Sequence, residues 1–180
     1  MPFTHLAFLR AIGPITHKVM SMRALCEACE RAGFLNTRSY IASGNLLFNA
    51  SAPEAELVAG LNAVIASFGL HLDNQAFIRT PDEMARIIAN NPFREAAEAR
   101  PDRLVAMFFN ETLEADLVQS ALKHDGAERF QAIGRVLYGD YAMGIGTSKV
   151  AMGFIEKRLK LRGTARNWNS VLKMQALALG

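Results

Sequence analysis

The sequence is poor in the residues that build metal centres and nucleophilic active sites. In 180 residues it has two cysteines, four histidines and one tryptophan. The histidines (His5, His17, His71 and His124) are scattered, with no pair at metal-ligand spacing and no cluster of carboxylates. A Gly-x-Ser-x-Gly elbow is also absent. We therefore expect no metal site and no cofactor.

The two cysteines form a C-x-x-C pair, Cys26 and Cys29, but its position argues against redox chemistry. They lie inside a segment whose positions 22, 25, 26 and 29 make one apolar helical stripe. A redox pair would open a helix after a strand, whereas this pair lies in mid-helix. We interpret both cysteines as core residues.

Long apolar runs are missing as well. No window approaches the roughly 18 apolar residues of a transmembrane helix, and the first residues lack the charged start and apolar run of a secretory signal. Hydrophobic residues make up 51% of the sequence and charged residues 21%, a globular composition. The sequence predicts a cytoplasmic protein and leaves its oligomeric state open.

Positive charge is concentrated at the C-terminal end. Residues 149–180 hold seven lysines and arginines against one acid, Glu156, whereas the net charge of the whole chain is only +3. A basic end on a mildly acidic body is typical of proteins that bind phosphate-bearing ligands or nucleic acid. The alternative interpretation is a solvated basic helix face.

Hydrophobic periodicity and turn residues predict an α+β fold made of two similar halves. In the first half we expect strands at residues 3–12, 37–42, 46–48 and 70–79 and helices at 21–32 and 53–68. This βαββαβ order is the pattern of a ferredoxin-like sandwich. In the second half we expect helices at 81–90, 113–123, 149–159 and 165–178 and strands at 103–110, 128–133 and 135–141, with a loop over 94–102. The sequence thus predicts a ferredoxin-like subdomain at 1–79 and a second one, with a basic C-terminal helix pair, at 80–180.

Two loops in the basic end are each expected to run into a helix. Gly144–Lys149 holds the N–H groups of residues 146–149 and a lysine, which suits one phosphate or carboxylate, although its spacing is not that of a Walker A motif. Residues 166–169, Arg-Asn-Trp-Asn, would form the first turn of the last helix, with Arg166 and Asn169 on one side and Trp168 towards the core. Capped helix starts without a ligand are the alternative.

Several short motifs together resemble a known family. They are Leu9-Arg10, the run Ser39-Tyr-Ile-Ala-Ser-Gly-Asn45, Gly146-x-Ser148-Lys149, and Thr164-x-Arg166-Asn-Trp-Asn169. In this order they resemble the bacterial family called domain of unknown function 1697, nearly from end to end. The resemblance implies two ferredoxin-like subdomains and implies no activity.

The chain departs from that family after its first strand. Members usually continue as Leu-Arg-Gly-Ile-Asn-x-Gly-Gly, a glycine-rich loop suited to a ligand. Here Ala11, Gly13, Ile15 and Thr16 replace the usual Gly, Asn, Gly and Gly. If the loop serves a shared ligand, this chain has altered or lost part of the site.

From these observations we expect a binding protein for a small anionic or phosphorylated ligand, held in a cleft between the two subdomains. The predicted ligand-binding residues are Arg10, Tyr40, Ser43, Asn45, Lys149, Arg166 and Asn169. One alternative is nucleic-acid binding through the basic C-terminal helices, arranged as a helix-turn-helix. Another is a cofactor-free enzyme acting on a small anionic substrate, for which the sequence places no clear general base.

Overall fold

The chain forms two compact units, each built around its own antiparallel sheet. The computed structural model describes residues 2–70 and 73–180. The first unit comprises residues 1–84 together with 174–180, and the second unit comprises residues 85–173. The predicted division after residue 79 lies close to this boundary, but the prediction did not separate residues 174–180 from the second half.

The first unit has the element order βαββαβ. Its strands are β1 (His5–Leu9), β2 (Leu35–Tyr40), β3 (Asn45–Asn49) and β4 (Ala76–Arg79), its helices are α1 (Met22–Arg31) and α2 (Glu54–Ala66), and a 3-10 turn η1 (Thr16–Lys18) precedes α1. The sheet order is β2-β3-β1-β4, and every neighbouring pair is antiparallel. This order is that of a ferredoxin-like sandwich.

The second unit repeats the order of the first. Its sheet contains β5 (Leu104–Phe109), β6 (Arg129–Ile133), β7 (Val136–Asp140) and β8 (Gly163–Asn167) in the order β6-β7-β5-β8. The remaining elements are α3 (Pro81–Ala89), α4 (Arg94–Ala99), α5 (Ala115–Ala121), η2 (Ile145–Thr147), α6 (Met152–Leu159) and α7 (Trp168–Leu179). The prediction of two ferredoxin-like subdomains is confirmed.

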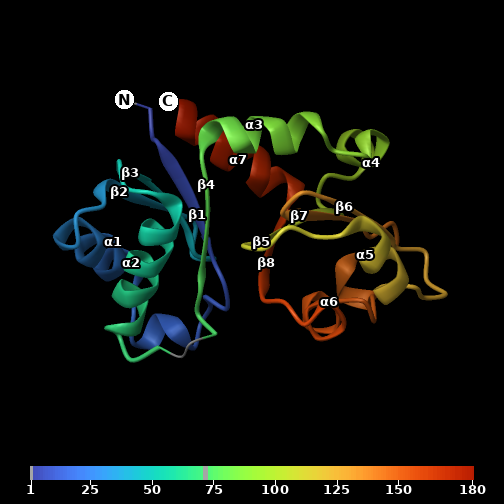
Figure 1. Ribbon diagram of the computed structural model, residues 1–180, viewed down its shortest axis with the longest axis horizontal. Helices are drawn as coiled ribbons and strands as arrows, with labels where there is room; N and C mark the ends of the chain where they lie inside the picture. Colours follow the sequence, from blue (N-terminus) through green and yellow to red (C-terminus); the bar gives the residue numbers. More distant parts are fainter. Residues whose placement is uncertain (1, 71–72) are drawn as a thin grey trace. The chain divides into compact units, whose positions relative to one another are not determined.

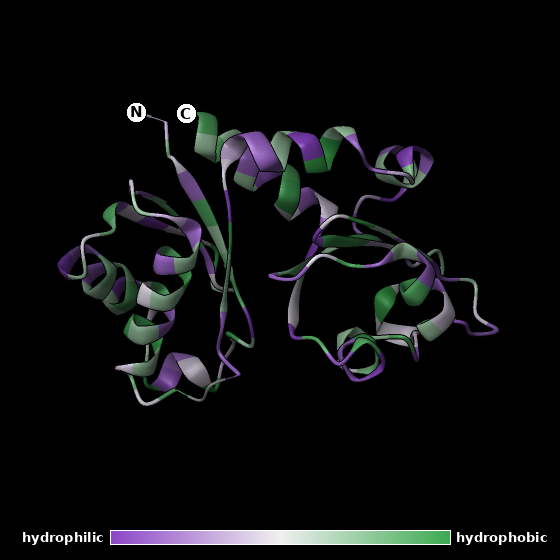
Figure 2. Ribbon diagram, viewed as in Figure 1, coloured by the Kyte–Doolittle hydropathy of each residue, from purple (hydrophilic) through white to green (hydrophobic). Residues whose placement is uncertain are grey.

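In each unit one face of the sheet packs against two helices. Because side chains alternate along a strand, Ala7 and Leu9 point to the same face of β1, where they are buried with Leu25 of α1 and Leu61 of α2. Figure 1 shows α1 and α2 together on one side of this sheet. Figure 2 shows that α2 begins with hydrophilic residues and continues as a more hydrophobic body. The second unit has its own core, in which β5 packs against α5 and α6.

Two predicted helix starts have the expected caps. The Ser21 hydroxyl accepts a hydrogen bond from the N–H of Ala24 at the start of α1 (3.1 Å). Before α3, the Thr80 N–H donates to the Glu83 carboxylate (2.8 Å), and the Glu83 N–H donates to the Thr80 hydroxyl (3.2 Å). This reciprocal pair is the capping box that the sequence predicts.

The C-terminal region corrects the sequence-based assignment. Residues 163–167 form the strand β8, paired with β5, and the last helix begins only at Trp168. Because a sheet strand stands between α6 and α7, these helices are not a helix-turn-helix. The preceding helix begins at Met152 rather than Lys149, and the glycine loop contains only the turn η2.

Smaller corrections concern the strand limits and one short helix. Residues 94–99 form α4, where we expected a loop. The fourth strand covers only Ala76–Arg79, and His71 and Leu72, within the strand predicted at 70–79, lie outside the described residues. In the part of the chain that the structure describes, no helix is both long and apolar enough to span a membrane.

Candidate functional site

Four of the predicted ligand-binding residues lie at one end of the first unit's sheet. Arg10 follows β1, Tyr40 ends β2, Asn45 begins β3, and Ser43 lies in the turn between these last two strands. The Asn45 side-chain amide donates to the Tyr40 carbonyl (3.1 Å) and to the Ser43 hydroxyl (3.0 Å). The Arg10 guanidinium donates to the carbonyl of Asp73 (2.9 Å). These hydrogen bonds hold the turn and the strand end.

Gly44 allows this turn to pack closely against the end of β1 and the loop that follows it. It has a φ of +76°, and a Cβ added there would lie 2.8 Å from Cγ1 of Ile12 and 3.0 Å from Cβ of Leu9. The Gly44 carbonyl also accepts the N–H of Leu9 (2.7 Å). Only glycine fits such a close approach in a left-handed conformation. The turn and the loop therefore depend on each other structurally.

The other three predicted residues lie in different segments of the second half. Lys149 is exposed ahead of α6, and Asn169 is exposed in α7. Arg166 lies on β8 with 8% of its surface exposed, and its guanidinium donates to the Thr164 hydroxyl and the Ala165 carbonyl, both at 2.8 Å. Burial lowers the pKa of Arg166 to about 10, which leaves it charged at neutral pH. That the seven residues form one ligand site stays a prediction.

A cavity with a basic lining lies at the C-terminal end of α6. It has a volume of about 490 Å³ and is lined by Gly153, Glu156, Lys157, Lys160, Leu161 and Arg162. We call it the basic hollow. Its three cations come from the last turn of α6 and from the short connection between α6 and β8. None of the seven residues predicted from the sequence lines it.

Two backbone features shape the basic hollow. The buried Glu156 carboxylate accepts the N–H of Gly163 (2.9 Å) and so holds the end of α6 to the start of β8. Lys160, the residue that ends α6, has a φ of +54° and a left-handed conformation. Glycine is the usual residue at this position of a helix because a Cβ is strained there.

The charges of the basic hollow are only partly balanced. Within the described ranges, the ammonium groups of Lys157 and Lys160 have no ion pair or hydrogen bond. Glu156, the one acid of the lining, is engaged by the Gly163 N–H. The sequence signal was the local excess of cations after residue 149. The cavity also depends on the strand β8, whose residues from Ala165 onwards were predicted as the start of a helix.

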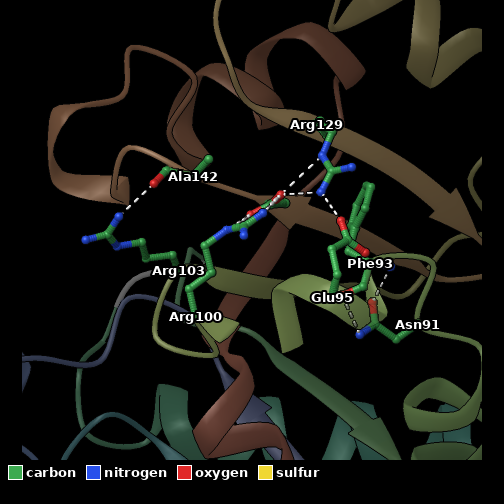
Figure 3. A network of polar contacts seen from close by, with 8 residues as sticks. Asn91, Phe93, Glu95, Arg100, Arg103, Arg129 and Ala142 are labelled. Atoms are coloured by element: carbon green, nitrogen blue, oxygen red, sulfur yellow. Dashed lines mark hydrogen bonds and ion pairs between the residues drawn. The ribbon is translucent and has the colours of Figure 1, made fainter. Parts of the chain in front are cut away.

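An ion-pair network of the second unit centres on Asp140, the last residue of β7. Its side chain is fully buried, and Arg100 binds both carboxylate oxygens with Nε at 3.1 Å and Nη2 at 2.7 Å. Nη2 of Arg129 lies 2.6 Å from the same carboxylate and also contacts Glu95. Figure 3 shows these two arginines converging, with Arg129 beside Phe93, whose ring centroid is 4.8 Å from the guanidinium carbon.

This network has a structural role. Burial by itself would raise the pKa of Asp140, but the hydrogen bonds and charges of Arg100 and Arg129 outweigh it and hold the pKa below its ordinary value. Asp140 therefore stays ionised and ties α4, β6 and β7 together. Arginine and carboxylate residues far apart in the sequence gave no signal from which it could be found.

A second polar cluster fastens the glycine loop. The Ser148 hydroxyl donates to the Glu128 carboxylate and accepts the N–H of Val150 (3.0 Å). The other oxygen of Glu128 lies 3.3 Å from Nε2 of His124. The Ser148 hydroxyl, followed by a backbone N–H and His124, lowers the pKa of Glu128. Because the serine hydroxyl both donates and accepts a hydrogen bond, this cluster fixes the conformation of the loop.

Among the described residues no group of three His, Cys, Asp or Glu side chains is arranged to hold a metal ion.

Comparison with protein families matches most of the chain. The family model described as "Protein of unknown function (DUF1697)" matches residues 3–138. The chain belongs to the DUF1697 family. The matched stretch includes the turn around Gly44 and ends before the glycine loop, the basic hollow and β8.

A solved structure extends the similarity over the whole DUF1697 chain. The conserved bacterial protein SP0830 from Streptococcus pneumoniae has a TM-score of 0.68 and 20% sequence identity, over 98% of this chain and 98% of that chain. At this identity the likeness shows the fold. A comparison with curated proteins gives no match.

The loop after β1, which departs from the expected family pattern, contains one residue in a left-handed conformation. Ala11 stands where the family pattern has Gly, and its φ is +57°. The loop is closed by Thr16, whose hydroxyl accepts the Gly13 N–H and donates to the Gly13 carbonyl, both at 2.9 Å. A cavity of about 220 Å³ remains beside residues 11–16. The substitutions thus change the side chains of the loop while Ala11 keeps a conformation suited to glycine.

Proposed function

We propose that this protein binds a small anionic ligand, a compound with one or two phosphate or carboxylate groups, in the basic hollow. The observation that carries the proposal is the pair Lys157 and Lys160, which line a cavity without an ionic partner among the described residues. Its volume of about 490 Å³ falls in the range of small-molecule sites, about 300–1,000 Å³. The compartment that we propose is the cytoplasm, in keeping with two free cysteines.

The conformation of Lys160 supports a ligand-binding role beyond simple helix stabilisation. Cations near the end of a helix are favoured by its dipole, so charge alone would not argue for a ligand. A left-handed non-glycine residue, however, costs about 1 kcal/mol. A lysine with a φ of +54° therefore stands where glycine would be more stable, and strained residues of this kind concentrate at binding sites.

The variant Lys160→Gly tests this proposal, because it removes the cation and the strain together. We expect it to raise the free energy of unfolding by up to about 1 kcal/mol. We also expect it to weaken binding of pyrophosphate about tenfold, the loss of one charge-assisted hydrogen bond. Calorimetric titration with pyrophosphate at low salt measures the second quantity, and thermal unfolding without ligand measures the first.

The matched control is Lys149→Ala, which removes the same charge from an exposed position outside the hollow. If this control weakens pyrophosphate binding as much as Lys160→Gly does, the attraction is unspecific and the proposal fails. Arg166→Ala, measured in the same series, tests the residues predicted from the sequence. Binding of short DNA that falls steeply with salt, without any pyrophosphate binding, would favour the nucleic-acid alternative.

A further inference from the structure

The first unit contains a second cavity, of opposite character. It has a volume of about 470 Å³ and lies where the end of α1, the start of β2, the end of β3 and the start of α2 meet. Its apolar lining includes Phe34, Leu35, Leu57 and Gly60, and Glu56 is the one charged residue of the described lining. We call it the apolar hollow.

Glycine keeps the apolar hollow open. Gly60 lies inside α2, where glycine is less stable than alanine. A Cβ at this position would stand 3.3 Å from Cζ of Phe34, which is tight for a carbon contact. Leu35, another lining residue, has 56% of its surface exposed at the start of the edge strand β2. Glycine at position 60 therefore leaves apolar surface open to a ligand, although alanine at this position would make α2 more stable.

Thr4 at the apolar hollow has hydrogen-bond partners, whereas the Glu56 carboxylate has none among the described residues. The Thr4 N–H donates to the Asn49 side chain (2.9 Å), and the Thr4 hydroxyl accepts the Ala50 N–H (3.0 Å). Glu56 is exposed in the first turn of α2, and across residues 2–70 and 73–180 its carboxylate makes no hydrogen bond or ion pair. A single negative charge at the rim of an apolar cavity thus favours positively charged ligands over neutral or negatively charged ones.

We infer that the apolar hollow binds a small organic amine, with its apolar group against Phe34, Leu57 and Gly60 and its ammonium group beside Glu56. The cavity supplies the apolar contact, and the carboxylate supplies the preference for a cation over a neutral or anionic analogue. This site is independent of the basic hollow, because it lies in the other unit and takes ligands of the opposite charge.

A set of three matched ligands tests the inference: benzylamine, benzyl alcohol and benzoate, titrated separately and followed by amide chemical shifts of the full chain. We expect benzylamine to bind about threefold more tightly than benzyl alcohol, the size of an exposed ion pair, and benzoate to bind most weakly. Glu56→Gln should abolish the preference. Glu54→Gln, which removes a charge from the same helical turn but does not line the hollow, should preserve it.

Variants that fill the cavity provide a second test of the inference. Gly60→Leu should abolish binding of benzylamine and benzyl alcohol, and Ala52→Leu, at another lining residue outside the helix, should do the same if Gly60→Leu does not fold. The inference is overturned if benzoate or benzyl alcohol binds as tightly as benzylamine, or if a folded filling variant still binds both ligands. Absence of shifts at residues 32–35 and 56–60 with every ligand would overturn it as well.

Discussion

At the scale of single residues, Asp140 shows how much one buried carboxylate contributes to this fold. Its side chain has no exposed surface and is bound by Arg100 and Arg129. We expect Asp140→Asn to lower the free energy of unfolding by about 2 kcal/mol at neutral pH, because Arg100 loses its charged partner and Arg129 loses one of two, keeping only Glu95. This loss of stability is smaller than that expected for a fully buried ion pair, because both arginine side chains are partly exposed to solvent.

The pH dependence gives this prediction its specific signature. The folded-state pKa of Asp140 is lowered, so its contribution is complete above the pKa of an unfolded aspartate, about 3.9. It is lost as the pH falls from there towards the lower folded-state pKa. Urea unfolding of both proteins from pH 7 to pH 3 should therefore show the stability difference shrinking in acid. A difference that stays constant over this range would contradict the assignment.

The candidate site was only partly predictable from single residues. The sequence indicated the C-terminal excess of cations and predicted a ligand site of seven residues, three of them in this region: Lys149 in the loop before α6, Arg166 on β8 and Asn169 on α7. That these residues form one site stays a prediction. Lys160 carried no signal, because a lysine that follows a helix gives no indication of a left-handed backbone. Asp140 and its two arginines also carried no signal, because their contacts join residues 40 and 11 positions apart.

At the scale of elements, Gly163 sets the packing of β8. A Cβ added there would lie 2.6 Å from Cε of Met152 and 2.7 Å from Cε1 of Phe109, with the Phe108 carbonyl oxygen at 3.0 Å. We expect Gly163→Ala to lower the free energy of unfolding by about 2 kcal/mol, because the side chains of α6 and the strand β5 must move away from β8 to admit the methyl group. Chemical denaturation followed by circular dichroism measures this loss.

Gly153, in the first turns of α6, provides the control of opposite sign. A Cβ there meets no atom within 4 Å, so Gly153→Ala should raise the free energy of unfolding by up to about 1 kcal/mol through helix propensity alone. Equal effects of the two substitutions would mean that the close approach at Gly163 does not limit packing.

Most elements were predictable because local signals and tertiary structure agree. The capping box at Thr80 and Glu83 and the turn at Gly134 each mark a boundary that the structure confirms. The strand β8 was missed for a physical reason. Its sequence, Gly-Thr-Ala-Arg-Asn, has little strand propensity, and its extended form depends on pairing with β5, from Gly163 opposite Phe109 to Asn167 opposite Val105.

At the scale of the whole molecule, the repeat extends to individual side chains. Arg79 on β4 and Arg166 on β8 are both buried on the fourth strand of their unit. Each donates from Nη1 to the carbonyl of the preceding residue, Ile78 at 2.6 Å and Ala165 at 2.8 Å. The sequence predicted the duplication from element order, but it assigned these two arginines to a strand and to a helix, so their equivalence emerged only from the sheet orders.

The last seven residues belong to the first unit, although they follow the second along the chain. Met174 and Ala178 are fully buried, and the Ala178 carbonyl accepts the N–H of Phe3 (2.8 Å). Deleting residues 174–180 should therefore destabilise the first unit, by about 3 kcal/mol from the loss of one large buried side chain and its neighbours. A prediction from chain order alone would place the damage in the second unit.

Hydrogen exchange followed by mass spectrometry separates these two outcomes. After the deletion, we expect amides of β1, β3 and β4 to exchange faster, while those of β5 and β7 keep their protection, because the second unit retains its own core of β5, α5 and α6. Deleting only Leu179 and Gly180, which are exposed, is the control and should leave both units protected. Faster exchange confined to residues 104–140 would show instead that the C-terminal end of α7 supports the second unit.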